Sequence, residues 1–362
     1  MMQHNNLMKS TLIYCVLFVA AAMSIMLYYA AVKKPGVSES VQEEIKPPVH
    51  TGGEASSAGP LKENEIAVDR SVQNTKYFCV PMPETVKAEE VVLENYYMEK
   101  ELCVSVSSDN AGDFREFYRT NSVYGNCENV TDGCFEEEEG RLCMRFSLTG
   151  VYEYRSIFED HILYVEFVPP KEMYEKVIVV DPAYGGGEHG VTAGSVMSKD
   201  ITVGVAKALK NLFDESGIKV YYTRMDDSNP DASLRAGLAE ETKADMLIRI
   251  EVSGDENSKV YGTAAVYNSQ FFIPGFGNVE LADLLEREVV TSISGKANGL
   301  VEAAVLDEVI NSTTVPAAAI RVGYLTNSQE AILLQREDYI KRIAEGIYNA
   351  VIKAYEQCGR MT

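Results

Sequence analysis

The sequence predicts an α/β fold with a mostly parallel sheet flanked by helices, preceded by a small all-β domain and a single N-terminal transmembrane helix. Three observations predict this arrangement. Strand-like and helix-like segments alternate over residues 176–358, short β-type runs follow one another over 72–170, and residues 11–32 carry no charge. Alternation of strands with helices is typical of parallel sheets, whereas consecutive strands without helices favour a separate β domain.

The charge of the chain excludes one broad class of partner. Its 362 residues include 33 Lys and Arg against 54 Asp and Glu, which gives a formal net charge of −21. Such a surface repels phosphate backbones, so we expect no nucleic acid partner. Hydrophobic residues make up 46% of the chain and charged residues 24%, which is typical of folded domains and too polar for a protein with many membrane spans.

Residues 11–32 predict a membrane anchor. These 22 uncharged residues, at about 1.5 Å per helical residue, span a hydrocarbon core of about 30 Å. A cleaved signal peptide is the alternative, but its apolar part is usually only about 7–15 residues long. Residues 1–10 are then a cytoplasmic stub, and residues 33–71, which are rich in Pro, Gly, Ser and Glu, are a flexible linker.

Residues 72–170 predict a small β-rich domain. Five short runs of β-type residues are separated by turn-rich or acidic pieces, at 75–80, 91–97, 102–108, 141–148 and 161–168. The cysteines form no CxxC pair, so they do not indicate zinc or thioredoxin-like chemistry. A disulfide between Cys127 and Cys134, or between Cys103 and Cys143, stays open beside buried free thiols.

The pattern of the sequence changes at residue 176. A continuous apolar run at 176–182 is typical of a strand buried in a parallel sheet. A Gly-rich loop and a helix at 200–217 follow, and Ile201, Val205 and Leu209 recur at helical spacing in that helix. The alternation continues with strands at 217–224, 244–252 and 317–325 and with helices at 233–243, 279–293 and 337–356.

Six segments of this region carry motifs in a fixed order. They are Asp181-Pro182-Ala183-Tyr184-Gly185-Gly186 with Glu188 and Gly190, Ser198-Lys199-Asp200, Thr223-Arg224 with Asp227, Arg235 with Ala239, Ala244-Asp245 with Ile248, Arg249, Ile250 and Glu251, and Pro316-Ala317 with Arg321, Gly323, Tyr324, Thr326 and Asn327. Together they resemble the zinc-dependent N-acetylmuramoyl-L-alanine amidases of bacterial cell-wall metabolism over essentially all of 176–358. The resemblance implies the amidase fold and a role at peptidoglycan.

The resemblance also identifies what this sequence lacks. In the family, zinc is held by the His of the first motif, the Glu that opens the first helix and the His that ends a later strand, and a Glu of the closing motif handles the proton. Those positions are here Tyr184, Ser198, Glu251 and Arg321. Tyr and Ser are poor zinc ligands at neutral pH, and Arg has no lone pair to offer. We therefore expect no catalytic residue, no metal and no cofactor, with zinc only if the chain builds an unorthodox site.

The replacements themselves predict local structure. Glu251 and Arg321 each close an apolar strand, and the crevice of an α/β sheet lies beyond the carboxyl ends of its strands, so we expect an ion pair between them. Ser198 is predicted to be the N-cap of the first helix, and the Tyr184 ring to fill the emptied metal cavity. An acidic ligand on Arg249 or Arg321 is an alternative to a purely structural pair. The candidate cleft residues are Asp181, Glu188, His189, Arg249, Glu251 and Arg321.

Three functions are consistent with these features. The first is a single-pass protein of the bacterial cytoplasmic membrane, with its bulk outside, that is catalytically inactive and binds peptidoglycan or an envelope protein to regulate cell-wall remodelling. The second is an active amidase that hydrolyses the amide between muramic acid and the L-Ala stem, with His189, Glu188 and Glu251 as substitute ligands. The third is a structural assembly module of an envelope complex.

Overall fold

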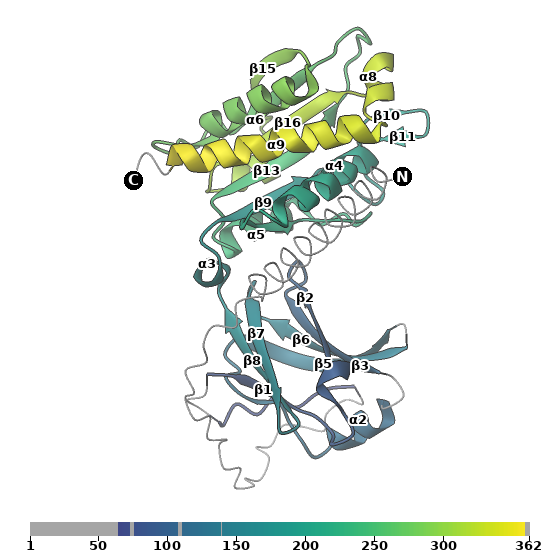
Figure 1. The fold of residues 1–362 in the computed structure, drawn as a ribbon, viewed down its shortest axis with the longest axis vertical. Helices are drawn as coiled ribbons and strands as arrows, with labels where there is room; N and C mark the ends of the chain where they lie inside the picture. Colours follow the sequence, from purple (N-terminus) through teal and green to yellow (C-terminus); the bar gives the residue numbers. More distant parts are fainter. Residues whose placement is uncertain (1–63, 73–75, 108–110, 139, 359–362) are drawn as a thin grey trace, which may run out of the picture. The chain divides into compact units, whose positions relative to one another are not determined.

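A computed structural model describes residues 64–72, 76–107, 111–138 and 140–358 (Figure 1). The predicted stub at 1–10 and the predicted membrane span at 11–32 lie outside the described residues, as do residues 33–63 of the predicted linker. Among the helices of the described ranges, none has both the length and the apolar character that a membrane crossing requires.

The described end of the predicted linker is ordered against the β-rich part of the chain. Ile66 is buried in the core of that part, and its N–H donates to the Gly133 carbonyl at 2.8 Å. Arg70 donates to the carbonyls of Cys127 and Val130 at 2.8 and 2.6 Å. The prediction of a flexible linker is therefore wrong for residues 64–71, because one apolar side chain and backbone pairing hold them in place.

The β-rich part contains two antiparallel sheets of four strands each. One has the order β4-β1-β8-β7, and the other has the order β2-β3-β6-β5. Alternate side chains of the central strands are buried between the sheets, as period-2 strands require. The strands are β1 (Phe78–Pro81), β2 (Val92–Tyr96), β3 (Glu101–Ser107), β4 (Tyr124–Gly125), β5 (Val130–Glu138), β6 (Arg141–Leu148), β7 (Glu153–Glu159) and β8 (Ile162–Val168), with the short helices η1 (Ala88–Glu90) and α2 (Ala111–Phe117) between them.

The disulfides considered from the sequence are not formed. The cysteines of the described residues are free thiols, and those at positions 79, 103, 127 and 143 are buried. Burial raises the pKa of the Cys103 thiol to about 12, with a further contribution from its hydrogen bond to Cys143. These two cysteines lie diagonally across the β3–β6 pairing, in which Ser105 is the direct partner of Cys143.

The α/β domain is built on a sheet of six strands in the order β12-β9-β13-β16-β14-β15. Four pairings are parallel and one, between β14 and β16, is antiparallel, so the sheet is mixed although mostly parallel. The strands are β9 (Val177–Pro182), β12 (Lys219–Tyr222), β13 (Met246–Ser253), β14 (Thr263–Tyr267), β15 (Ala297–Glu302) and β16 (Ala317–Tyr324). The sequence predicts four of them and misses β14 and β15.

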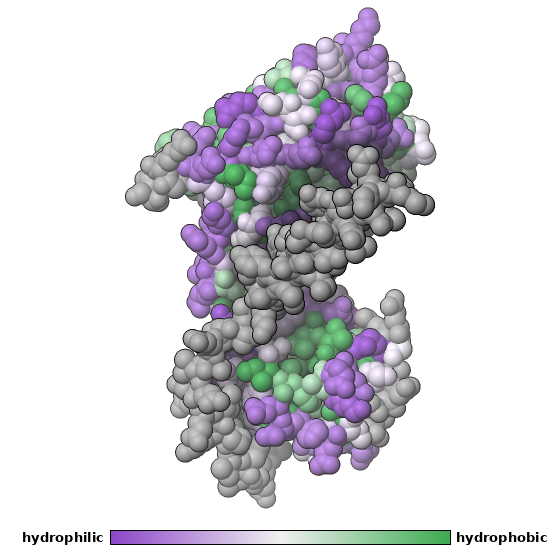
Figure 2. Space-filling view, in the orientation of Figure 1, coloured by the Kyte–Doolittle hydropathy of each residue, from purple (hydrophilic) through white to green (hydrophobic). Residues whose placement is uncertain are grey.

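Helices cover both faces of this sheet. The long helices α4 (Ser198–Phe213), α6 (Asn278–Ile293) and α9 (Glu337–Cys358) pack their apolar sides on one face, while α5 (Ala232–Glu241) and α7 (Glu308–Ser312) pack on the other. Hydrophilic side chains cover much of the domain on the face that Figure 2 presents. The shorter elements are α3 (Pro170–Met173), the hairpin strands β10 (Thr192–Ala193) and β11 (Val196–Met197), and α8 (Ser328–Leu333).

The strand period decides which side chains meet at the site. Along β13, Ile248 and Ile250 belong to the core under α4, α6 and α9, whereas Leu247 belongs to the core under α5 and α7. Because neighbours on a strand alternate between faces, Arg249 and Glu251 lie on the α5 and α7 side. The same alternation places Asp181 of β9 and Arg321 of β16 on that side, toward the carboxyl ends of their strands.

Candidate functional site

Four charged side chains of three neighbouring strands form a continuous series of ion pairs, which we call the charge ladder: Asp181, Arg249, Glu251 and Arg321. The strand register produces it. Arg249 of β13 lies opposite Asp181 of β9, and Glu251 of β13 lies opposite Arg321 of β16. The structure thus brings together four of the six cleft residues that the sequence singles out.

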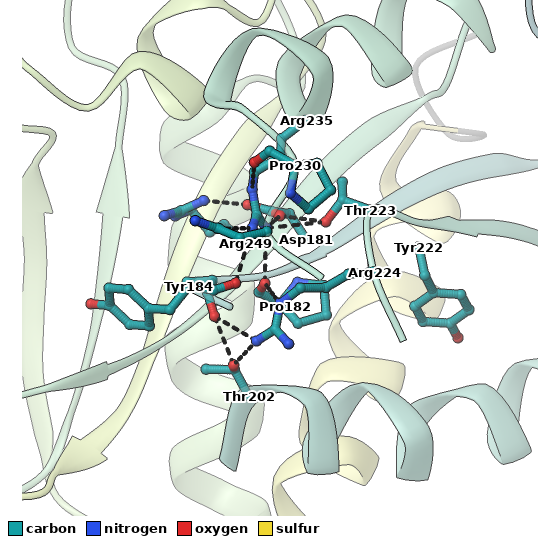
Figure 3. A network of polar contacts seen from close by, with 12 residues as sticks. Asp181, Pro182, Tyr184, Thr202, Tyr222, Thr223, Arg224, Pro230, Arg235 and Arg249 are labelled. Atoms are coloured by element: carbon teal, nitrogen blue, oxygen red, sulfur yellow. Dashed lines mark hydrogen bonds and ion pairs between the residues drawn. The ribbon is translucent and has the colours of Figure 1, made fainter. Parts of the chain in front are cut away.

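Asp181 is the buried end of the charge ladder. Its carboxylate accepts hydrogen bonds from Thr223 Oγ1 at 2.5 Å, from Arg235 Nη1 at 2.6 Å and from Arg249 Nη1. Figure 3 shows Thr223, Arg235 and Arg249 converging on it. Burial alone raises the pKa of Asp181, but Arg249, Arg235 and the Thr223 hydrogen bond outweigh burial and hold it below its usual range. Asp181 is therefore a structural anion at neutral pH.

Glu251 is held between two arginines. Its Oε1 accepts from Arg249 Nε at 2.9 Å and its Oε2 accepts from Arg321 Nε at 3.2 Å. The predicted ion pair between Glu251 and Arg321 is confirmed. The second arginine on Glu251 was not predicted, although its position two residues earlier on the same strand gives it the same face.

Tyr184 lies beside the charge ladder on the loop after β9. Its backbone is in the left-handed region, with φ +67°, and its carbonyl accepts from Arg235 Nη2 at 2.9 Å. A Cβ added to Gly190 would lie 2.7 Å from ring carbons of Tyr184 and 2.8 Å from Ser198 Cβ, so these three residues pack together. Burial and the nearby Glu251 raise the pKa of the Tyr184 hydroxyl, and Arg249 and Arg321 offset part of that rise.

Ser198 is buried, but it does not cap the helix. Helix α4 begins at Ser198, and the N-cap is Met197, which makes no side-chain cap. The Ser198 hydroxyl instead donates to the Val191 carbonyl at 2.9 Å. The prediction that Ser198 is the N-cap is therefore wrong. Ser198 is the first residue of the helix, and its hydroxyl bonds to the preceding loop.

Arg224 fixes the loop that carries Tyr184. Its Nε donates to the Pro182 carbonyl at 2.9 Å, and its Nη2 donates to the Ala183 carbonyl at 2.8 Å and to Thr202 Oγ1 at 3.0 Å (Figure 3). Through these hydrogen bonds the buried Arg224 guanidinium joins the end of β9 to helix α4. Arg224 is one of the motif residues, and its role is positioning.

Glu188 and His189 are exposed and form no ion pair with the charge ladder in the described contacts. Glu188 accepts from Asn229 at 3.5 Å, and the His189 carbonyl accepts from the Lys199 N–H at 3.3 Å. Within the described residues, no group of three or more His, Cys, Asp and Glu side chains is arranged to hold a metal ion. The set of His189, Glu188 and Glu251 that an unorthodox zinc site requires is therefore not assembled.

The sequence does not predict that Asp307 interacts with the charge ladder. Asp307 is the N-cap of α7 and accepts from the Ile310 N–H at 3.2 Å. Burial raises the pKa of Asp307, Glu251 raises it further, and Arg249 and Arg321 lower it, which places Asp307 within electrostatic reach of the charge ladder. An Asp before the apolar pair of a short helix is an N-cap signal, but only the fold reveals its neighbours.

Comparison with known proteins identifies the α/β domain. Residues 178–353 match the family model described as N-acetylmuramoyl-L-alanine amidase. The germination-specific N-acetylmuramoyl-L-alanine amidase of Bacillus subtilis is 26% identical over 200 residues, which cover 51% of this chain and 81% of that protein. The amidase CwlM of Mycobacterium tuberculosis is 28% identical over 186 residues, which cover 50% of this chain and 45% of that protein.

Solved structures of N-acetylmuramoyl-L-alanine amidases also resemble part of this chain. The N-acetylmuramoyl-L-alanine amidase of Clostridium difficile 630 matches with 28% identity and a TM-score of 0.47, over 50% of this chain and 97% of that structure. The family model covers the segment that contains all six motifs. The α/β domain is therefore similar, over residues 178–353, to the N-acetylmuramoyl-L-alanine amidase family.

Proposed function

We propose that this chain is a bacterial envelope protein whose amidase-fold domain binds peptidoglycan without hydrolysing it, and that residues 11–32 anchor it in the cytoplasmic membrane with its bulk outside. The observation that carries the proposal is the ion pair between Glu251 and Arg321. By family resemblance, these are the positions of a zinc ligand and of the proton-handling Glu. Here they form an ion pair with each other.

The residues at the family's metal positions do not fit a zinc ion. Both carboxylate oxygens of Glu251 already accept from guanidinium groups, and the Ser198 hydroxyl donates to a backbone carbonyl. The raised pKa of Tyr184 keeps its hydroxyl protonated at neutral pH. A dication placed here would also be repelled by Arg249 and Arg321, and zinc binding normally requires deprotonated N, S or O ligands.

Proton transfer fails for a separate reason. Hydrolysis of an amide needs a group that takes a proton from water and gives it to the leaving nitrogen. Arg321 stands where the family has its Glu, and a guanidinium cannot act as a base near neutral pH. No step of the family's reaction is therefore left to these residues, and the retained scaffold supports binding instead.

The ligand is inferred from the family. The relatives are named for the bond between N-acetylmuramic acid and L-alanine, which occurs in peptidoglycan. A domain that keeps the loops, the strand ends and the positioning residues of that fold keeps the surface on which this polymer would lie. Localisation at the outer side of the membrane would give it access to the polymer.

The proposal is tested with the full-length chain purified in a mild detergent. The zinc content is measured after equilibration with the metal, release of stem peptides from isolated sacculi is assayed, and cosedimentation with sacculi is quantified, with an active amidase as the positive control. We expect substoichiometric zinc, no peptide release and saturable cosedimentation. About one zinc per chain together with peptide release would overturn the claim of inactivity. Absence of cosedimentation would overturn the claim of peptidoglycan binding.

A further inference from the structure

The charge ladder leads from the interior of the domain to its surface. The exposed fraction of the side chain is 0% for Asp181, 13% for Arg249, 11% for Glu251 and 33% for Arg321. Arg321 is thus the member of the series that solvent and ligands can reach. A ligand that meets this part of the site meets the guanidinium group of Arg321.

Arg321 uses only part of its hydrogen-bonding capacity inside the protein. A guanidinium carries five N–H donors, and the recorded bond of Arg321 is the one from Nε to Glu251. Among the contacts of the described residues, neither Nη1 nor Nη2 of Arg321 has an acceptor. These two nitrogens form the face of the group that suits bidentate binding of a planar anion.

The directly paired groups carry an excess of positive charge. Three guanidinium groups, those of Arg235, Arg249 and Arg321, are ion-paired with two carboxylates, those of Asp181 and Glu251. These five groups therefore carry one uncompensated positive charge, although the formal net charge of the whole chain is −21.

The other acidic groups near the site form no ion pair with Arg321 in the described contacts. Asp307 caps α7 and acts on Arg321 only at a distance, and Glu188 is exposed and accepts from Asn229. The Tyr184 hydroxyl is within electrostatic reach of Arg321, but its raised pKa leaves it uncharged at neutral pH, so it does not supply an anion either.

We propose that Nη1 and Nη2 of Arg321 bind a carboxylate group of a peptidoglycan stem peptide. This inference rests on the proposed function and names the chemical group that the same site recognises. Stem peptides end in, and carry along their length, free carboxylates, and a carboxylate matches the guanidinium fork in both shape and charge. The buried part of the charge ladder holds the guanidinium in place, so that little side-chain entropy is lost on binding.

The test compares the wild-type chain with three variants for binding to sacculi. Arg321→Gln removes the charge, Arg321→Lys keeps the charge but removes the fork, and Arg287→Gln is the control. Arg287 lies on α6, is half exposed and pairs with Asp283. We expect Arg321→Gln to weaken binding about tenfold or more, Arg321→Lys to weaken it less, and Arg287→Gln to leave it unchanged. Thermal melts of all four chains confirm that they are folded.

A change on the ligand side makes the test independent of folding. Sacculi whose carboxylates have been converted to amides with carbodiimide and ammonia should bind the wild-type chain as weakly as untreated sacculi bind Arg321→Gln. The variant should lose nothing further on amidated sacculi. Sacculi stripped of wall phosphates with hydrofluoric acid should bind the wild-type chain normally; lost binding there would identify a phosphate ligand and overturn the proposal.

The two proposals fail in different ways. If the wild-type chain does not bind sacculi of any kind, peptidoglycan binding itself is wrong, and the carboxylate inference falls with it. If the wild-type chain binds and Arg321→Gln or amidation changes nothing, the carboxylate inference alone is overturned.

Discussion

Glu251 and Arg321 lie directly opposite each other on two neighbouring parallel strands, and Arg321 Nε donates to Glu251 Oε2 at 3.2 Å. The other Glu251 oxygen is bonded to Arg249, so the carboxylate has a cation on each side. Removing the carboxylate leaves two guanidinium groups facing each other, whereas removing Arg321 leaves Glu251 still paired with Arg249. The two halves of this ion pair therefore differ in their importance for stability.

We predict that Glu251→Gln lowers the free energy of unfolding by about 2–4 kcal/mol, because it leaves partly buried cations unpaired. Arg321→Gln should cost only about 1 kcal/mol, since its side chain is one-third exposed and solvent replaces the lost contact. Urea unfolding followed by circular dichroism measures both, with Arg287→Gln as a control that stays within about 0.5 kcal/mol of wild type. Equal losses for the two ladder variants would contradict this asymmetry.

Asp181 makes a pH-dependent contribution to stability. Its pKa is lowered in the folded state, since its arginine partners and the Thr223 hydroxyl outweigh the cost of burial. A carboxyl whose folded pKa lies below its unfolded pKa stabilises the fold above about pH 4, and this contribution disappears as the pH falls through the folded pKa. Asp181→Asn, which removes that group, is expected to cost about 3–5 kcal/mol at pH 7.

Urea unfolding of the wild-type chain and Asp181→Asn at a series of pH values from 7 to 3 checks this prediction. The difference between the two unfolding free energies should be constant above about pH 5 and should shrink toward acid pH. Comparison with the variant cancels the titration of the other carboxylates. A difference that grows toward acid pH would mean that the sign of the shift is wrong.

We predict that substitution by alanine has opposite effects at two helix glycines. A Cβ on Gly346 of α9 would lie 2.6 Å from the Val289 Cα of α6, whereas a Cβ on Gly204 of α4 would meet nothing within 4 Å. We expect Gly346→Ala to destabilise the domain by about 1–3 kcal/mol through backbone separation. Gly204→Ala should be neutral or stabilise it by up to about 1 kcal/mol, because alanine favours the helix.

Thermal unfolding of both glycine variants beside the wild type is the measurement. Each variant is the control for the other, since the change in the unfolded chain is the same. Stabilisation by Gly346→Ala would show that α6 and α9 do not approach as closely as the structure has them.

The sequence predicts those parts of the fold in which pattern and environment agree. The apolar runs that become β9, β13 and β16 are recognisable because both faces of these strands are buried, and their shared carboxyl ends bring Glu251 and Arg321 together. Strand β15 escapes prediction because nearly all of its side chains are exposed and its run Ala297–Glu302 contains a Gly. Its edge position leaves no apolar alternation to detect.

The missed details of the site depend on contacts between distant segments. Ser198 is the first residue of the helix rather than its cap, and its hydroxyl donates to the carbonyl of Val191 in the preceding loop. The proximity of Asp307 to the charge ladder depends on how α7 packs against the sheet. Spacing along the sequence carries neither piece of information, whereas the pairing of Arg249 with Asp181 follows from strand register once the strand order is known.

The final prediction is that the scaffold can regain a metal site. The combined variant Tyr184→His, Ser198→Glu, Glu251→His and Arg321→Glu restores the four residues that the family has at these positions. Histidine suits position 184, since it tolerates the left-handed backbone found there better than most residues. Its smaller ring also leaves more room for a longer side chain at 198, since the Tyr184 ring and Ser198 Cβ both lie beside Gly190. A Glu in the first turn of α4 is favoured by the helix dipole.

We expect this combined variant to bind about one zinc per chain, while the wild type and the partial variant Arg321→Glu do not. The partial variant is the matched control, because it places a second carboxylate opposite Glu251 without supplying nitrogen ligands, and it should melt at a lower temperature than the wild type. Zinc raises the melting temperature of a chain that binds it only in the folded state, so calorimetry with and without the metal gives a second readout. A folded combined variant that takes up no zinc would mean that the backbone at β9, α4, β13 and β16 has moved away from the family's ligand geometry, and that more than four side chains separate this domain from a metal-binding one.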